Sequence, residues 1–316
     1  MGRAGAAQRA QSARVHPDTT FHFPQSGADV ITTDSSKCPL PGSSEQAPSH
    51  AAAVPVTETH YRDGRFEERP AALAGEVPIA LEYNGVSHAV MLATPEDLED
   101  FALGFSIAEG IVEDPGEIYG VEVQPSSRGI TVAIELASGA FARLKDRRRT
   151  LVGRTGCGIC GAENLDHVLR PLPALAGQGP RIRPQALSAA LAALVSAQRL
   201  QKQTGAVHGA AWSDLPGTAE LVREDVGRHN ALDKLIGAVV RGKVHQRPGF
   251  VVVTSRASIE MVQKATCIAT TLAAVSAPTR LAAQVAHDCG LTLVGFARGS
   301  EFSVYSHPWR LTPATE

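Results

Sequence analysis

The sequence predicts an α/β protein, with a small N-terminal α+β unit and a larger three-layer α/β domain that are joined by a loop rich in glycine and cysteine. Two observations carry this prediction. A hairpin pattern followed by a helix pattern lies in residues 77–105, and apolar strands alternate with helices in residues 250–296. Alternating strands and helices are typical of a mostly parallel sheet that is layered between helices.

Length, composition and charge limit the possible functions. With 316 residues, of which 43% are hydrophobic and 20% are charged, the chain can bury a core and suits about two domains. Because the formal net charge is −2, the chain has no overall positive field for DNA or RNA, and we expect no nucleic-acid partner. The sequence has no apolar run of about 18 residues, so we expect no membrane span.

The number of cysteines and the residues at the N-terminus indicate in which cellular compartment the protein works. Five cysteines spread over this length do not resemble the dense disulfide framework of small secreted domains. The N-terminus also lacks the basic and then apolar order of a secretory signal. We therefore expect a cytoplasmic protein with reduced thiols.

The chain divides by composition into five stretches. The first is rich in Ala, Ser, Pro and Gln and has no helix or strand period, so we expect it to be disordered, with order beginning near Arg62. The expected stretches are a disordered extension (1–54), a small α+β domain (62–145), the cysteine loop and linker (146–184), an α/β domain (185–310) and a tail (311–316).

A β-hairpin is the clearest element of the N-terminal unit. Apolar residues alternate in residues 77–83 and again in residues 86–92, and Asn84-Gly85 between them is a usual sequence for a two-residue turn. Thr94 then has the side chain of a helix N-cap and Pro95 suits the first helical position, so we expect a helix to begin there. Two short strands follow the helix, at 121–124 and 130–136.

In the second half, apolar periodicity and turn residues predict the remaining elements. They are a helix through Leu187 and Leu194, a hairpin (210–213 and 220–222), three strands (250–254, 273–276 and 291–296), the helices between these strands (258–271 and 281–288), and a last strand (302–305). Gly290 is expected to end the second of these helices. The last strand is expected to run antiparallel at a sheet edge.

The middle of the chain carries the clearest chemistry. Cys157 and Cys160 are separated by two residues, with Gly156, Gly158 and Gly161 around them. Glycine removes bulk beside the thiols, so a large partner can approach them closely. A basic run just upstream, at 145–149, favours the thiolate, which is the form of cysteine that attacks. The pattern therefore predicts sulfur chemistry.

Other interpretations of the cysteine pair remain open. A structural zinc ion needs four ligands, and the sequence has no second Cys-X-X-Cys or nearby His pair, so we predict no metal site, although two copies could share one ion. A thioredoxin-like redox motif is a further alternative, but Gly161 disfavours the helix that begins at the cysteines of that fold. Cys267 and Cys289, in and beside a predicted helix, are expected to be buried in packing.

Arginines follow three strands of the predicted sheet. Arg256, Arg280 and Arg298 each lie in or beside the segment between a strand and the next element. Carboxyl ends of parallel strands meet at one edge, where α/β sheets bind ligands, and helix N-termini favour phosphate. We therefore predict a basic rim that binds an anion. The polar stretch 223–234, at the start of another helix, is expected either to take part in binding or only to cap and solvate its helix.

Four stretches carry a resemblance to known proteins. They are Arg154-Thr155-Gly156-Cys157-Gly158-Ile159-Cys160-Gly161, Glu224-Asp225-Val226-Gly227-Arg228-His229-Asn230-Ala231-Leu232-Asp233-Lys234, Arg256-Ala257-Ser258 with Glu260, Gln263 and Lys264, and Leu293-Val294-Gly295-Phe296-Ala297-Arg298. In these stretches the chain resembles the formate dehydrogenase accessory sulfurtransferases, a family often called FdhD. The second stretch is the most specific, and the resemblance spans roughly 72–310 with matching order throughout.

The resemblance implies a cytidine-deaminase-like α/β domain and a sulfur carrier required for formate dehydrogenase activity. In this family a cysteine desulfurase passes sulfur to the cysteine loop, so Cys157 would bear a persulfide and Cys160 would assist or share in the transfer. The loop delivers the sulfur to bis(molybdopterin guanine dinucleotide), the molybdenum cofactor of the client, formate dehydrogenase. The resemblance also suggests a homodimer.

Cofactor-binding residues are expected in three places. The resemblance implies the stretch Phe296-Ala297-Arg298-Gly299-Ser300-Glu301. Because the cofactor carries two pyrophosphates and two guanines, Arg256, Arg280 and Arg298 are further candidates. His208 and His229 are candidates that could equally be hydrogen-bonded within the fold. The zinc signature of deaminases, His-X-Glu with Pro-Cys-X-X-Cys, is absent, so we expect no deamination.

Three functions are compatible with these residues. A sulfurtransferase is favoured, because it uses both the thiol pair and the three arginines. A non-catalytic chaperone that binds the molybdenum cofactor is an alternative from another class, in which the cysteines touch the cofactor but move no sulfur. A thiol-disulfide oxidoreductase is the third.

Overall fold

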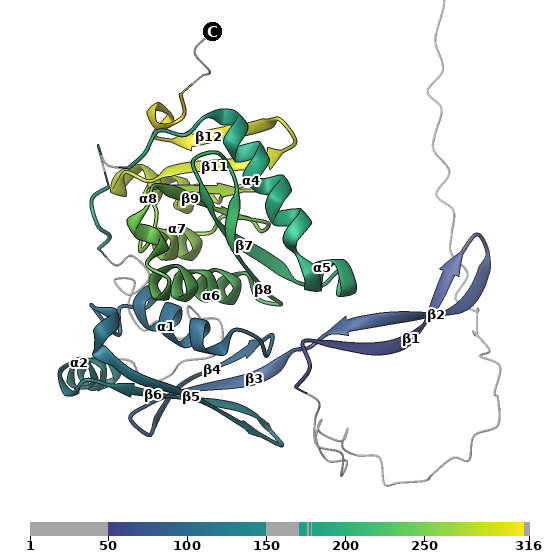
Figure 1. Cartoon of the computed structure of the whole chain (residues 1–316), viewed down its shortest axis with the longest axis horizontal. Helices are drawn as coiled ribbons and strands as arrows, with labels where there is room; N and C mark the ends of the chain where they lie inside the picture. The colour runs from purple at the N-terminus through teal and green to yellow at the C-terminus, as the bar shows by residue number, and fades with distance from the viewer. Residues whose placement is uncertain (1–49, 150–170, 176, 178, 313–316) are drawn as a thin grey trace, which may run out of the picture. The chain divides into compact units, whose positions relative to one another are not determined.

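The computed structural model describes residues 50–149, 171–175, 177 and 179–312. These residues form a hairpin that is a sheet by itself, a four-stranded sheet and a six-stranded sheet (Figure 1). The strands are β1 (Ala53–Arg62), β2 (Arg65–Ala74), β3 (Val77–Tyr83), β4 (Val86–Ala93), β5 (Ile118–Ser126), β6 (Gly129–Leu136), β7 (His208–Asp214), β8 (Ala219–Asp225), β9 (Gly249–Val253), β10 (Thr271–Ala274), β11 (Thr292–Arg298) and β12 (Glu301–Ser306). The helices are α1 (Leu98–Ala108), α2 (Ser138–Arg149), α4 (Pro184–Ala197), α5 (Arg199–Thr204), α6 (Arg228–Arg241), α7 (Ile259–Ala265) and α8 (Arg280–Cys289), with short 3₁₀ turns η1 (Pro115–Glu117), η2 (Val244–Gln246) and η3 (Pro308–Arg310).

The four-stranded sheet has the order β4-β3-β6-β5. The predicted hairpin is confirmed: β3 and β4 pair antiparallel across Asn84 and Gly85, whose φ angles of 48° and 75° suit a two-residue turn. Residues that alternate along β3 and β6, such as Ile79, Leu81 and Val132, are buried in one core with Phe101 of α1. One face of the sheet is therefore covered by α1.

The predicted start of α1 at Thr94 and Pro95 is wrong. The helix begins at Leu98, and its N-cap residue is Asp97, in the left-handed conformation and without a side-chain cap hydrogen bond. The Thr94 hydroxyl instead accepts a hydrogen bond from the backbone N–H of Val226, which lies far along the chain. Thr followed by Pro is a usual sequence for a helix start. Here the Thr94 hydroxyl is engaged in the contact with Val226 and does not cap the helix.

The six-stranded sheet has the order β12-β11-β10-β9-β7-β8. Its three central strands β9, β10 and β11 run parallel, as the alternating pattern predicted. The flanking strands β7, β8 and β12 pair antiparallel, so the expectation of a mostly parallel sheet holds for the centre only. The last strand is antiparallel at one edge, as expected.

Helices cover both faces of the six-stranded sheet, which confirms the three-layer prediction. On one face, α4 packs with Phe250, Val252 and Val294 in a common core, and α6, α7 and α8 pack on the other with Val251 and Leu293 (Figure 1). None of the helices in the described ranges is long and apolar enough to cross a membrane.

Two further boundaries differ from the prediction. The helix expected over 258–271 ends at Ala265, and β10 already begins at Thr271. Apolar residues continue through this region without a Gly or Pro, so periodicity alone does not mark where the helix stops. Order was expected near Arg62, but β1 begins at Ala53, whereas residues 1–49 of the predicted disordered extension lie outside the described residues.

The two larger sheets meet where α1 crosses α6. Gly104 of α1 lies against the backbone carbonyl of Asp233, and Gly237 of α6 lies against that of Asp100. A Cβ atom at these glycines would come within 1.7 Å and 1.9 Å of the two carbonyl oxygens. Glycine at both positions therefore allows the two helices to pack backbone against backbone.

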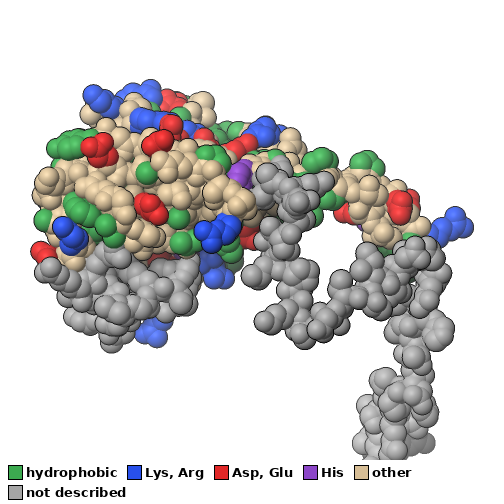
Figure 2. All heavy atoms as spheres, turned by 90° about the horizontal axis from the view of Figure 1, so that it is seen from below, with side chains coloured by type: hydrophobic (Ala, Val, Ile, Leu, Met, Phe, Trp, Pro, Cys, Tyr) green, Lys and Arg blue, Asp and Glu red, His purple; other side chains and the backbone are tan. Residues whose placement is uncertain are grey.

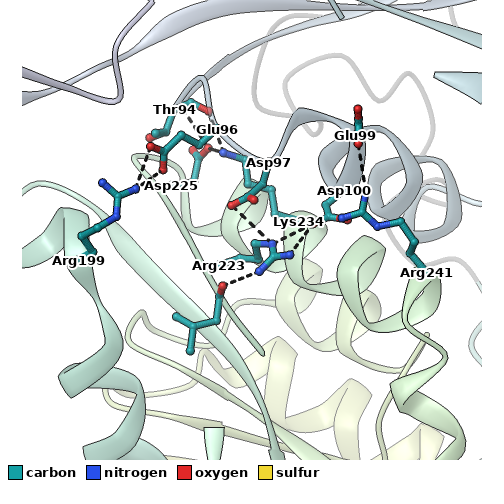
Figure 3. Close-up of polar contacts among 11 residues, drawn as sticks. Thr94, Glu96, Asp97, Glu99, Asp100, Arg199, Arg223, Asp225, Lys234 and Arg241 are labelled. Carbon is teal, nitrogen blue, oxygen red and sulfur yellow. Dashed lines mark hydrogen bonds and ion pairs between the residues drawn. The ribbon is translucent and has the colours of Figure 1, made fainter. Parts of the chain in front are cut away.

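A buried polar network accompanies this crossing (Figure 3). The Thr94 backbone N–H donates to Asp225 Oδ2 over 3.0 Å, and the Thr94 carbonyl accepts from Lys234 Nζ over 2.8 Å. Lys234 Nζ also lies 2.7 Å from Asp225 Oδ2, and both side chains are fully buried. Asp100 of α1 pairs with Arg223 and Arg241 in the same region. The polar stretch 223–234 thus joins the four-stranded sheet to the six-stranded sheet.

Candidate functional site

Three loops lie side by side at the carboxyl edge of β9, β10 and β11. The Ser276 backbone N–H after β10 donates to the carbonyl of Ser255 after β9 over 3.5 Å, and the Phe296 N–H in β11 donates to the Ser276 carbonyl over 3.3 Å. Ala257 and Pro278 also form a parallel bridge. The structure therefore brings together the three segments that carry Arg256, Arg280 and Arg298.

The side chains of these three arginines are exposed. Within residues 50–149 and 171–312 as described, none of the three side chains makes a hydrogen bond or an ion pair. Arg280 is the first residue of α8, next to the N-cap Thr279, whose hydroxyl accepts from the Ala282 N–H. Unpaired guanidinium groups beside a helix start suit an anionic ligand.

Two more elements bring cationic or titratable groups to the same edge. Because β7 runs antiparallel to β9, its first residue His208 lies at the carboxyl end of β9, where the Gly209 N–H donates to the Thr254 hydroxyl over 2.9 Å. The next strand, β8, ends in the same place and leads into α6, which starts with Arg228 and His229. Arg228 Nε is buried without a hydrogen-bond partner in the described chain.

Glu260 of α7 brings a negative charge close to His229. Its Oε2 lies 3.6 Å from His229 Nε2, an ion-pair distance that is too long for a good hydrogen bond, and it accepts from the Ser258 hydroxyl. The contact with His229 and then the Ser258 hydroxyl lower the pKa of Glu260 to about 2, against the opposing effect of partial burial. Glu260 is therefore ionised at neutral pH and places a negative charge beside the His229 ring.

Burial, and then nearby positive charge, shift the pKa values of two other groups at this edge. Burial lowers the pKa of His208 from its usual value, and the Arg228 charge adds to the effect. Burial also lowers the pKa of Arg228, with a further contribution from Arg256. His208 is thus neutral at pH 7, while Arg228 and Arg256 repel each other across the site. Binding of an anion between them would relieve this repulsion.

Phe296 has an unusual backbone at the third loop. Its φ angle is 53°, in the left-handed region, and its side chain is 48% exposed. The pairing of β11 with β12 is irregular at this point, between Gly295 and Arg298. A non-glycine residue in this conformation is strained, and such strain gathers at functional sites. The exposed ring offers a flat surface on which a planar base could stack.

The rest of the predicted stretch 296–301 forms the turn into β12. Ala297 is buried, whereas Arg298, Gly299, Ser300 and Glu301 are exposed. Gly299 has a φ angle of 55°, which permits the tight reversal, and the backbones of Arg298 and Glu301 lie opposite each other across the β11–β12 turn. Phe296 and Arg298 are therefore the side chains of this stretch best placed for a ligand.

Most of the polar stretch 223–234 does not face this edge. Glu224 accepts hydrogen bonds from the backbone N–H groups of Leu200 and Gln201 and so caps α5. Asp225 and Lys234 join the two sheets, as described above. Sequence reasoning considered Arg228 only as part of the polar stretch 223–234 and did not assign Glu260 to the site. Both stand at helix starts, and this position was the signal that could have identified them.

The cysteines divide into two groups. Cys157 and Cys160 lie outside the described residues. Cys289 is buried, as expected, but the expectation for Cys267 is wrong, because this residue is exposed. Cys267 follows the end of α7 at Ala265 and so leaves the packed helix face. Among the residues that the structure describes, no group of three or more His, Cys, Asp or Glu side chains could hold a metal ion.

Comparisons with known proteins agree with this architecture. A solved structure of a protein described as a formate dehydrogenase accessory protein of Desulfotalea psychrophila covers 83% of this chain and all of its own, with a TM-score of 0.67 and 22% identity. At that identity the likeness concerns the fold alone, and it confirms the α/β architecture that the sequence predicted.

Sequence relatives are much more similar. A protein of Variovorax paradoxus named sulfur carrier protein FdhD is 58% identical over 240 residues, which are 76% of this chain and 86% of the relative. A protein of the same name from Cupriavidus necator is 50% identical over 86% of this chain and 94% of its own. The model of the FdhD/NarQ family matches residues 74–312. This chain therefore belongs to the FdhD/NarQ family.

Proposed function

We propose that this protein is a sulfur carrier that serves formate dehydrogenase, with the activity of a sulfurtransferase. The observation that carries the proposal is the grouping of Arg228, Arg256, Arg280, Arg298 and Phe296 at one sheet edge, in a chain with a Cys-X-X-Cys sequence. The names of its relatives, sulfur carrier protein FdhD, support the same role.

Loading of sulfur would occur on Cys157. Its thiolate attacks the outer sulfur of the persulfide on a cysteine desulfurase, the sulfur–sulfur bond of the donor breaks, and the donor cysteine leaves as a thiolate. The product is a persulfide on Cys157. Glycines on both sides give the donor access, and the cationic residues upstream favour the thiolate.

Release of sulfur would involve Cys160. Its thiolate attacks the inner sulfur of the persulfide, a disulfide forms between Cys157 and Cys160, and the outer sulfur leaves as sulfide toward the acceptor. A thiol reductant then restores the two thiols. In this scheme Cys160 resolves the persulfide.

The carboxyl edge would hold the acceptor, bis(molybdopterin guanine dinucleotide), which is the substrate of the transfer and the cofactor of the client formate dehydrogenase. Arg228, Arg256, Arg280 and Arg298 would bind its pyrophosphates, and Phe296 would stack on a guanine. Neutral His208 can accept or donate a hydrogen bond there. We expect the protein to work as a homodimer in the cytoplasm, where thiols stay reduced.

The direct test is the mass of the protein after incubation with a cysteine desulfurase and cysteine. We expect the wild-type chain to gain one sulfur atom, and Cys157→Ala to gain none. Cys267→Ala is the matched control, because Cys267 is an exposed thiol outside the motif, and it should load like the wild type. Equal loading of Cys157→Ala would show that Cys157 is not the carrier. Restoration of formate dehydrogenase by that variant would favour a cofactor chaperone.

A further inference from the structure

A cavity of about 480 Å³ lies at the amino edge of the six-stranded sheet, where β9 and β10 begin. Trp212 of β7, Gly249 at the start of β9 and Thr270 just before β10 belong to its wall. Because the central strands run parallel, this edge is opposite to the carboxyl edge described above. The volume is within the range of pockets that hold small molecules, about 300–1,000 Å³.

Two glycines make room for the side chains of this wall. The indole ring of Trp212 lies against Gly249, where a Cβ atom would come within 2.5 Å of Trp212 Cζ2. Thr270 lies against Gly179 in a similar way, since a Cβ atom there would be 2.0 Å from Thr270 Oγ1. Both side chains can therefore occupy the wall because glycine faces them.

A buried arginine holds another part of the wall in place. The Leu175 carbonyl accepts a hydrogen bond from Arg310 over 2.6 Å, and the Leu175 N–H donates to the Cys289 carbonyl over 2.7 Å. Arg310 is fully buried and also donates to the Gly290 carbonyl and the Thr292 hydroxyl. This side of the cavity is therefore bounded by backbone that is hydrogen-bonded to the core.

Two polar atoms of the wall residues lack a hydrogen-bond partner. Trp212 is 2% exposed, and its Nε1 is buried without a partner among the described residues. Thr270 Oγ1 is buried without a partner in the same part of the chain. An unpaired buried polar group is unfavourable, and an indole N–H can only donate. A ligand with acceptor oxygens would satisfy both atoms.

The charges around the cavity favour an anion. None of the described residues that line it is acidic, and they include Arg247 and His245. Arg247 binds Glu220 through two of its N–H groups, which leaves further N–H groups for a ligand. On the face of the molecule that Figure 2 shows, by contrast, basic and acidic side chains are interspersed. The cavity thus differs from that face in its charge.

The surroundings also indicate which kind of anion fits. Helix α6 ends at Arg241 and α7 ends at Ala265, shortly before β9 and β10 begin. Helix C-termini carry partial negative charge, so the double charge of a phosphate group is disfavoured here. Part of the wall is apolar and includes Ile268 and Ala269. A singly charged group on an apolar body therefore fits best.

We propose that this cavity binds a small organic carboxylate with an apolar body, such as an aromatic or branched-chain acid. The carboxylate accepts hydrogen bonds from Trp212 Nε1 and Thr270 Oγ1 and pairs with Arg247. The apolar body packs on Ile268 and Ala269. Because the site is separate from the carboxyl edge, its failure would leave the proposed sulfur transfer untouched.

Nuclear magnetic resonance of the ¹⁵N-labelled full chain tests the site through its indole N–H signals. The chain has two tryptophans, and Trp309→Phe identifies the signal of Trp212. Phenylacetate, indoleacetate and isocaproate are the probes. At least one of them is expected to shift the Trp212 signal downfield and to saturate with a Kd below about 1 mM. Acetate, which lacks the apolar body, and the neutral amide of the same probe should bind at least about 10-fold more weakly.

Variants of the wall connect the shift to the cavity. Arg247→Gln and Thr270→Val should each weaken binding of the probe at least about 5-fold, because each removes a group that contacts the carboxylate. Arg199→Gln is the matched control, since Arg199 is also an exposed arginine paired with a glutamate but does not line the cavity. This control should bind the probe as the wild type does, and circular dichroism should be the same for all variants.

Three results would overturn the proposal. The first is that none of the three probes shifts the Trp212 signal at about ten times that concentration. The second is equal binding of the neutral amide, since the charge would then play no part. The third is loss of the shift when guanosine diphosphate is present at saturation, because the probe would then occupy the carboxyl edge and not this cavity.

Discussion

At the scale of single residues, Arg256 tests the basic edge. Its guanidinium group makes no hydrogen bond or ion pair within the described residues and stands near the Arg228 guanidinium group and the His208 ring. Arg256→Ala should weaken binding of guanosine diphosphate, which has the pyrophosphate and base of the cofactor, by about 10- to 100-fold, since a charge-assisted hydrogen bond contributes ~1.5–3 kcal/mol. Titration calorimetry measures the change.

A matched arginine provides the control for that titration. Arg247 precedes β9 at the opposite edge of the sheet and pairs with Glu220 over 2.8 Å. Arg247→Ala removes the same charge from the chain without touching the proposed site. Equal losses of affinity in the two variants would mean that the net charge of the chain, and not the carboxyl edge, binds the nucleotide.

Lys264 carries a second prediction at this scale. Its Nζ lies 2.8 Å from Asp233 Oδ1 and 2.8 Å from Glu109 Oε1, in a buried site. Burial raises the pKa of Asp233 to about 6, and the Lys264 charge opposes that rise. Lys264→Met leaves the carboxylate without its cation and should reduce the free energy of unfolding by about 3–5 kcal/mol at pH 8.

The loss of stability in Lys264→Met should be smaller at low pH than at high pH. Without Lys264 the pKa of Asp233 rises further above its ordinary value, so at pH 5 the carboxyl group is protonated and neutral in the folded state. The loss should therefore be clearly smaller at pH 5 than at pH 8 in urea unfolding. Lys202→Met, at an exposed position of α5, should change the stability by less than about 0.5 kcal/mol. A loss for Lys264→Met that is the same at both pH values would contradict this account.

At the scale of elements, the crossing of α1 and α6 is the most sensitive contact. Gly104→Ala would place a Cβ atom 1.7 Å from the Asp233 carbonyl oxygen, so the helices must separate. We expect a loss of about 3 kcal/mol or more in urea unfolding, at the upper end of single-residue effects. Gly139→Ala in α2 is the control, because its Cβ would meet nothing closer than 3.8 Å, and it should be neutral or slightly stabilising. A neutral Gly104→Ala would disprove the close packing.

Elements with a local signal were predictable from sequence, and those set by distant contacts were not. The turn at Asn84-Gly85 and the helix end at Gly290 need only their own residues, and both are confirmed. The start of α1 was misplaced because Thr94 bonds to Asp225, Val226 and Lys234, which are remote in sequence. Arg256, Arg280 and Arg298 could be grouped from sequence because the order of the strands places them at one edge of the sheet. Glu260 was not assigned to the site because its contact with His229 joins residues that are remote in sequence.

At the scale of the whole molecule, the buried network between the sheets predicts cooperative unfolding. Both tryptophans of the chain, Trp212 and Trp309, lie with the six-stranded sheet, whereas far-ultraviolet circular dichroism also reports the four-stranded sheet. Because Asp225 and Lys234 tie the sheets together through Thr94, the two signals should change at the same urea concentration. A circular-dichroism transition that precedes the fluorescence transition would show that the sheets unfold separately.

The central claim is that the thiols load sulfur and that the basic edge then presents the acceptor. A chain with Arg256→Ala and Arg298→Ala separates these steps, because it keeps Cys157 and Cys160. The decisive measurement compares its sulfur loading by mass with its ability to restore formate dehydrogenase activity in a strain that lacks this protein. We expect wild-type loading and less than about one tenth of the wild-type restoration, which corresponds to a loss of at least ~1.4 kcal/mol in acceptor binding. Full restoration by this variant would contradict the account.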